Sequence, residues 1–231
     1  MKSWTTTNGF KITRILFGRS NVFLVSYKNC NILIDTSSGM NWKKLDRRLH
    51  DLNIKTIDYL ILTHSHYDHA ANAAKLQREY GAIVIIHKDE ACFLEKGKNA
   101  MTKGAIFFTK LLVNKLTPVF LDKRFFEPSK PDIITDTNFS LKDSGINGYI
   151  MHTPGHTIGS QSIIIDDEIA LVGDAMFGVL PGSVFPPFAE DEAEMVKSWG
   201  KLLQTKCRIF LPSHGTSNSR ELVERDFKKR Q

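Results

Sequence analysis

The chain has 231 residues, of which 42% are hydrophobic and 24% charged, as in a globular protein that buries a core of its own. No apolar run approaches the roughly 18 residues needed to span a bilayer, and the amino-terminal segment lacks the continuous apolar stretch of a signal peptide. Its three cysteines are widely spaced and odd in number, which predicts free thiols in a reducing compartment. We therefore expect a cytoplasmic protein without a membrane span.

The net charge of +6 favours acidic partners in general. The basic residues do not form a stripe interleaved with aromatic residues, so the pattern does not indicate nucleic-acid binding. We expect a small-molecule substrate, and the sequence leaves the formation of a homodimer open.

The first half of the chain begins with short β-type runs separated by turn residues, at 10–17, 21–27 and 31–35, which predict an antiparallel meander. Apolar residues at helical spacing then predict a helix over 42–52. The nearly continuous apolar run at 56–62 predicts a buried strand. A helix is predicted over 70–80, ending at Gly81, and it is followed by a second buried strand over 82–87.

Residues 97–131 differ in character, because they mix aromatic residues, lysines and leucines. We expect a helical insertion here that covers one face of the domain, as a lid or as a packing or dimer surface. The remaining segments predict four strands, an amphipathic helix over 190–203, a buried strand over 207–211 and a terminal helix over 220–229. The order of elements predicts one α/β (α+β) domain spanning 1–231 and built of two similar halves.

Three histidines and an aspartate lie in THSHYDH, residues 63–69, directly after the apolar strand at 56–62. Unpartnered polar groups at the end of a buried strand are costly, and a metal ion is the first candidate for their partner. In an extended segment His64 and His66 point the same way, and Asp68 and His69 follow where the chain turns into the helix.

Three further candidate ligands also follow apolar strands: His156 in MHTPGHTIGS, Asp174 in LVGDAMF and His214 in FLPSHG. Because strand ends converge on one edge of a sheet, these side chains can meet although they are far apart in the sequence. Imidazole and carboxylate groups are ligands of zinc and related divalent metals. Seven candidates exceed one tetrahedral site, whereas two sites that share one carboxylate would use them all.

The segments THSHYDHA, TPGHTIGS, GDAMF and LPSHG, in this order, resemble the ligand segments of the metallo-β-lactamase fold superfamily, over about residues 20–215. The resemblance implies an αββα four-layer sandwich with a dinuclear metal site, two Zn²⁺ ions with Fe or Mn as alternatives, at the edge between the sheets. Carried over by position, the first metal is held by His64, His66 and His156, the second by Asp68, His69 and His214, and Asp174 bridges them. Asp35 is either a turn residue or, by the resemblance, a buried support for the histidine segment.

Two divalent ions about 3.5–4 Å apart can share a hydroxide and bring its pKa toward neutrality, so that a nucleophile exists at pH 7. One ion can also polarise the oxygen of the group under attack. We assign Asp68 and Asp174 as the catalytic residues, with Asp68 orienting the bridging hydroxide. The sequence identifies no proton donor for the leaving group.

Asp174 narrows the reaction that the resemblance implies. β-Lactamases of this family carry Cys or Ser at that position, whereas aspartate resembles the glyoxalase II group, lactonases, persulfide dioxygenases and tRNA-processing nucleases. A typical glyoxalase II adds a helical carboxyl-terminal domain, but this chain ends soon after His214. We expect a zinc-dependent hydrolase of a carboxylic ester, lactone or thioester. The alternatives are an iron-dependent persulfide dioxygenase and a metal-dependent phosphodiesterase or RNase.

Overall fold

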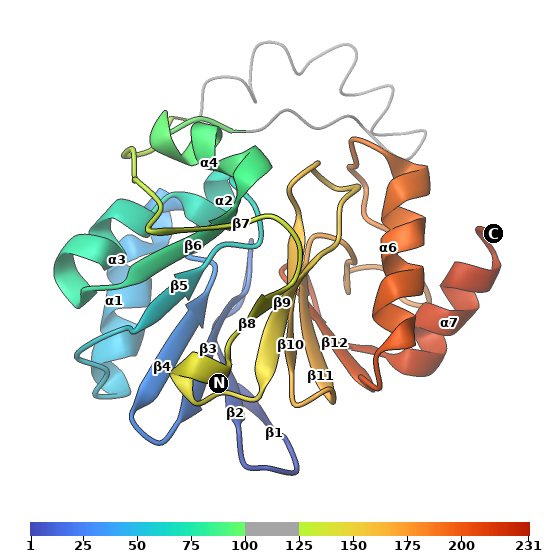
Figure 1. Ribbon diagram of the computed structural model, residues 1–231, viewed down its shortest axis with the longest axis horizontal. Helices are drawn as coiled ribbons and strands as arrows, with labels where there is room; N and C mark the ends of the chain where they lie inside the picture. The colour runs from blue at the N-terminus through green and yellow to red at the C-terminus, as the bar shows by residue number, and fades with distance from the viewer. Residues whose placement is uncertain (100–124) are drawn as a thin grey trace.

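The computed structural model describes residues 1–99 and 125–231 (Figure 1). Most of the insertion expected at 97–131 therefore lies outside the described residues. Among those that are described, no helix is both long and apolar enough to cross a membrane.

Two β-sheets form the centre of the described structure. In chain order, the seven strands described in the first sheet are β1 (Lys2–Thr5), β2 (Lys11–Leu16), β3 (Val22–Tyr27), β4 (Cys30–Ile34), β5 (Tyr59–Ile61), β6 (Ile83–His87) and β7 (Ile133–Thr135). The strands β1 to β4 form the predicted meander with one more strand at its edge, whereas β4 to β7 are parallel.

The second sheet has six described strands in the order β13 (Asn218–Ser219), β12 (Ile209–Pro212), β11 (Ile169–Gly173), β10 (Gln161–Ile165), β9 (Gly148–His152) and β8 (Phe139–Ser140). Only β11 and β12 are parallel within this described set. The described α-helices are α1 (Trp42–Asp51), α2 (Tyr67–Ala70), α3 (Ala73–Tyr80), α4 (Lys88–Glu95), α6 (Glu192–Gln204) and α7 (Arg220–Lys228).

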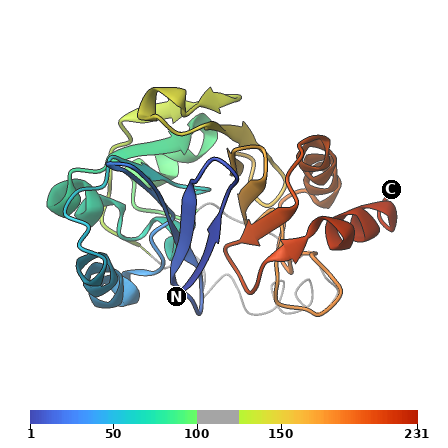
Figure 2. The same cartoon turned by 90° about the horizontal axis from the view of Figure 1, so that it is seen from below.

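The layers follow the order helix, sheet, sheet, helix, as the resemblance implied. Helices α1, α3 and α4 lie on the outer side of the first sheet, and α6 and α7 lie on the outer side of the second (Figures 1 and 2). Alternation along the strands explains the layering, because neighbouring side chains of a strand face opposite sides of a sheet. Ile163 and Ile165 pack between the two sheets, whereas Ile164 packs toward α6.

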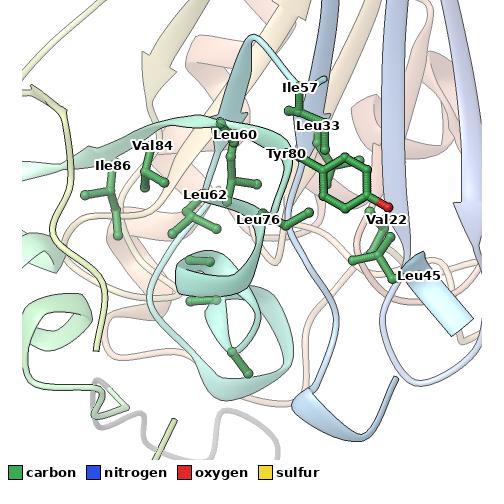
Figure 3. Packing of buried hydrophobic residues seen from close by; sticks show 14 of the residues in the cluster. Val22, Leu33, Leu45, Ile57, Leu60, Leu62, Leu76, Tyr80, Val84 and Ile86 are labelled. Atoms are coloured by element: carbon green, nitrogen blue, oxygen red, sulfur yellow. The ribbon is translucent and has the colours of Figure 1, made fainter. Parts of the chain in front are cut away.

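The outer core of the first sheet shows the same alternation. Leu33, Leu60, Leu62, Val84 and Ile86 are buried on the helix-facing side, together with apolar residues of α1 and α3 (Figure 3). The intervening residues of these strands face the second sheet instead. The nearly continuous apolar runs in the sequence therefore reflect strands that are covered on both faces.

One predicted helix is divided in the structure. The helix expected over 70–80 is instead α2, which begins at Tyr67, and α3, which begins at Ala73. Asn72 lies at the break, and its side-chain amide donates hydrogen bonds to the carbonyls of Thr36, Ser37 and Ser38. Asp68 and His69 thus lie within a helical turn and not ahead of it. Gly81 ends α3 in the left-handed conformation, with φ of 68°, as predicted.

Candidate metal centre

The seven candidate ligands meet at one edge of the two sheets. They follow strands β5, β9, β11 and β12, and their ligand atoms form three groups in which all atoms lie within 4.8 Å of one another. We call His64, His66 and His156 the first cluster, and Asp68, His69 and His214 the second cluster. The third group joins His64 and His69 to Asp174. The structure thus brings together every residue that the sequence predicted for the site.

Ring nitrogens converge in the first cluster. His66 Nδ1 lies 2.8 Å from His64 Nε2 and 3.2 Å from His156 Nε2. His156 donates its Nδ1 proton to the Phe188 carbonyl at 2.9 Å, which leaves the Nε2 lone pair facing the cluster.

The tautomer of His64 is fixed through Thr63. The Thr63 hydroxyl donates to Asp35 Oδ2 at 2.9 Å, so its oxygen accepts the Nδ1 proton of His64 at 3.0 Å. The Nε2 lone pair of His64 consequently faces the cluster as well. A set of imidazole lone pairs directed at one point fits a cation such as Zn²⁺.

The second cluster combines histidines with a carboxylate. His69 directs Nδ1 to Asp35 at 2.8 Å and Nε2 toward Asp68, 3.9 Å away. His214 Nε2 lies 3.7 Å from Asp68 Oδ2. Both histidines therefore present Nε2 to the same space as the Asp68 carboxylate.

Asp174 lies between the two clusters. One of its oxygens is 3.4 Å from His156 Nε2 and 3.2 Å from His214 Nε2, and the other is 3.6 Å from His69 Nε2. The same carboxylate therefore faces both clusters, as a bridging ligand would.

Two buried atoms of the centre test whether a cation fits. Among the described residues, His69 Nε2 and Asp174 Oδ1 are buried and have no hydrogen-bond partner. Leaving such groups unpaired costs about 1–3 kcal/mol each, and a cation between them would satisfy both. Because the surrounding donors are imidazoles and carboxylates, the site fits Zn²⁺ and also Fe or Mn.

The two clusters differ in charge. Burial lowers the pKa of His64 well below its usual value, and it lowers the pKa of His156 to about 4. Burial also opposes protonation of His69, but Asp174, Asp35 and Asp68 outweigh it and raise the pKa of His69 to about 10. The pKa of His214 is likewise raised against burial, chiefly by Asp174. Without metal, His64 and His156 are therefore neutral near pH 7, whereas His69 is protonated.

Asp35 has the supporting role that the resemblance implied. It is buried at the end of β4 and accepts hydrogen bonds from the Thr63 amide and hydroxyl, from His69 Nδ1 and from the Ser213 hydroxyl, at 2.8–2.9 Å. Its backbone is left-handed, with φ of 59°, which is strained for a residue other than glycine. These four hydrogen bonds offset that strain and connect both clusters.

The sequence did not identify the residues that join the two sheets at this edge. The backbone amide of Gln161 donates to the Thr63 carbonyl at 3.0 Å. The backbone amide of Asn21 donates to the Ser213 carbonyl at 2.6 Å. The Asn21 side chain also donates to the carbonyls of Pro212 and Gly215, on either side of His214. An asparagine just before an apolar strand is a weak signal in a sequence, because such residues usually form turns.

Comparison with known proteins agrees with this geometry. Residues 15–214 match the family model described as the metallo-beta-lactamase superfamily. The chain is 31% identical over 159 residues to a Methanocaldococcus jannaschii protein named "Probable metallo-hydrolase", with 68% of each chain covered. It is 29% identical over 159 residues to a hydroxyacylglutathione hydrolase of Pelagibacter ubique, and this match covers 68% of the chain but only 51% of that relative.

Solved structures share the fold at low sequence identity. A metallo-beta-lactamase superfamily protein from Sulfolobus tokodaii superimposes with a TM-score of 0.66 at 19% identity, covering 91% of this chain and 79% of the other. A metallo-beta-lactamase family protein from Thermus thermophilus gives a TM-score of 0.69 at 19% identity, covering 92% and 74%. With the family match across most of its length and the same layered fold, the chain belongs to the metallo-β-lactamase superfamily.

Proposed function

We propose that the protein is a dinuclear-metal hydrolase of a carboxylic ester, lactone or thioester. The observation that carries this proposal is the position of Asp174, whose carboxylate faces the nitrogen donors of both clusters at 3.2–3.6 Å. The first cluster would hold one metal, the second cluster the other, and Asp174 would bridge them. Zinc is the proposed metal, with Fe or Mn as alternatives.

A pair of divalent ions supplies a nucleophile at neutral pH by lowering the pKa of bound water, and it also polarises the carbonyl under attack. The chain's own residues fix the donors for that pair. Asp35 orients His69 directly and His64 through Thr63, and the Phe188 carbonyl orients His156.

Asp68 is the carboxylate of the centre that is most open to substrate, with 21% of its side chain exposed against 5% for Asp174. Burial alone would raise the pKa of Asp68, but His69 and His214 outweigh it and lower the pKa below its usual value. An ionised carboxylate in this place can accept a hydrogen bond from the attacking water and orient it.

Thioesters are the substrate class with the most support among the three. Relatives that match this chain at 23–29% identity carry the name hydroxyacylglutathione hydrolase. Asp174 also stands where, by the resemblance of the motifs, β-lactamases carry Cys or Ser.

The three cysteines are free thiols, which supports the proposal of a cytoplasmic protein.

The test is the metal content of the purified protein, measured together with turnover of a panel of thioesters, lactones and phosphodiesters. We expect two zinc ions per chain and turnover of a carbonyl substrate, and His66→Ala should abolish that turnover. One iron and no zinc, with oxygen uptake on a persulfide, would assign the protein to the dioxygenases instead. Salt-sensitive RNA cleavage without ester turnover would assign it to the nucleases.

A further inference from the structure

Glu90 is a buried carboxylate outside the metal ligands. It lies in α4, a helix that the sequence did not predict, and its side chain is fully buried. A buried carboxylate is costly unless several hydrogen-bond donors satisfy it. The hydrogen-bond donors that contact Glu90 indicate its role.

Both oxygens of Glu90 bind segments that carry metal ligands. Oε2 accepts from the backbone amide of Ser65 at 2.9 Å and also from the Ser65 hydroxyl. Oε1 accepts from the backbone amide of Gly159 at 3.3 Å. Ser65 lies between His64 and His66, and Gly159 lies three residues after His156. One carboxylate therefore connects the two segments that supply all three nitrogens of the first cluster.

The approach of the second segment is close. A Cβ added to Gly159 would lie 2.5 Å from Glu90 Cγ and 3.1 Å from its Oε1. Only glycine allows the backbone to come this near to the carboxylate. A larger residue at position 159 would therefore clash with Glu90 and move the backbone away from its carboxylate.

Asp35 and Glu90 contact different sets of metal-ligand segments. Asp35 touches His69 and, through Thr63, His64, so it acts on both clusters. The contacts described for Glu90 reach Ser65 and Gly159, which flank ligands of the first cluster only.

We propose that Glu90 is a positioning residue for the first metal, because it holds the segment of His64 and His66 at a fixed distance from the segment of His156. The proposal rests on the proposed function only in so far as the centre binds two metals. It does not depend on which substrate is hydrolysed.

The variant that tests it is Glu90→Gln, which keeps the shape of the side chain. A carboxylate accepts at both oxygens, whereas an amide must point its NH₂ group at either Ser65 or Gly159 and oppose the donor there. The support of a metal ligand is worth about 10- to 100-fold in metal affinity. We expect that loss in one of the two zinc-binding steps.

The two steps are measured by zinc competition against a chromogenic chelator, and ligand variants identify them. His156→Ala removes a donor of the first cluster alone, and His214→Ala removes a donor of the second. Glu90→Gln should weaken the step that is lost in His156→Ala and leave unchanged the step that is lost in His214→Ala.

Asp226→Asn is the matched control. Asp226 is also buried, and it accepts hydrogen bonds from the Ser183 hydroxyl and the Val184 amide, both at 2.8 Å, in a segment without metal ligands. Both donors bind the same oxygen of Asp226, so the amide variant can keep these hydrogen bonds but loses the buried charge that faces Lys229. We therefore expect it to lower the free energy of unfolding while both zinc-binding steps stay unchanged.

Equal weakening of both steps by Glu90→Gln, or no change in either, would overturn the proposal. If circular dichroism shows that Glu90→Gln does not fold, Ser65→Ala, which removes only the hydroxyl donor, is judged by the same criterion with a smaller expected shift. Failure of the proposed function has a different signature, namely a wild-type protein with two zinc sites that turns over no ester, lactone or thioester.

Discussion

The first and second clusters lie at the same edge of the sheets but are built differently. The first consists of three imidazoles, and burial keeps the pKa of His64 and of His156 low. The second contains a carboxylate, and the neighbouring acidic groups raise the pKa of His214 and keep His69 protonated when metal is absent. His64 and His156 therefore offer their Nε2 lone pairs without losing a proton, whereas His69 must release a proton before it can bind a cation.

The largest effect should come from the residue that both clusters share. Asp174→Asn removes the charge that faces both metals, and we expect both zinc ions to bind weakly and kcat/KM to fall by more than the roughly 100-fold that loss of a supporting residue costs. Zinc content after dialysis and turnover of the preferred substrate measure this. Asp166→Asn, at a carboxylate bound by Asn8 and Asn147, is the control and should keep both ions. Two tightly bound zinc ions in Asp174→Asn would refute the bridging assignment.

Asp35→Asn should weaken both zinc-binding steps by about 10- to 100-fold, because Asp35 supports His64 and His69 together. Asparagine tolerates the left-handed backbone at this position, so the effect reports on the lost acceptor and not on backbone strain. Chelator competition measures both steps. A change confined to one step would show that Asp35 serves a single metal.

The pH dependence should separate the clusters. His69 is protonated below its raised pKa of about 10, so zinc must displace that proton, and affinity of the second cluster falls as pH falls. We expect about a tenfold loss per pH unit for each proton released, between about pH 9 and 6. The pKa of His156 is about 4, so the first cluster should show little change over the same range.

Variants with a single cluster provide the measurement. His156→Ala retains the second cluster and His214→Ala retains the first, so zinc affinity of each can be followed across pH by chelator competition. Equal slopes in the two variants would mean that the charge difference described here does not govern metal binding.

The smallest effect should come from packing around one ligand. The rings of Phe177 and His214 have centroids 4.5 Å apart, and such pairs contribute about 0.5–1.5 kcal/mol. Phe177→Ala should therefore weaken the second cluster by at most about tenfold and leave the first unchanged. The zinc-competition assay measures this effect. Weaker zinc binding at the first cluster alone would contradict the placement of His214.

The sequence predicted which side chains meet at the sheet edge because strand ends and ligand-type residues are both visible in it, while their role as metal ligands stays a prediction. His64, Asp174 and His214 each follow an apolar run, and the order of the segments resembles one family. Glu90 was missed because its partners, Ser65 and Gly159, are its neighbours only in space. Helix α4 was missed because KDEACFLE shows little helical periodicity and follows directly on a strand. The break at Asn72 depends on carbonyls far back in the chain, which no local pattern reveals.

The joint between the sheets has a consequence for how the protein folds. The contacts from Thr63 to Gln161 and from Asn21 to Ser213 connect segments that are about a hundred residues or more apart, and contacts of this kind close late. The centre is therefore assembled only when both sheets have docked. A cation that binds the finished centre but not the open chain stabilises it by about 2.7 kcal/mol per site at a hundredfold excess over Kd. If the centre binds metal as proposed, metal uptake would report completed folding, and a chelator would shift the balance toward the unfolded chain.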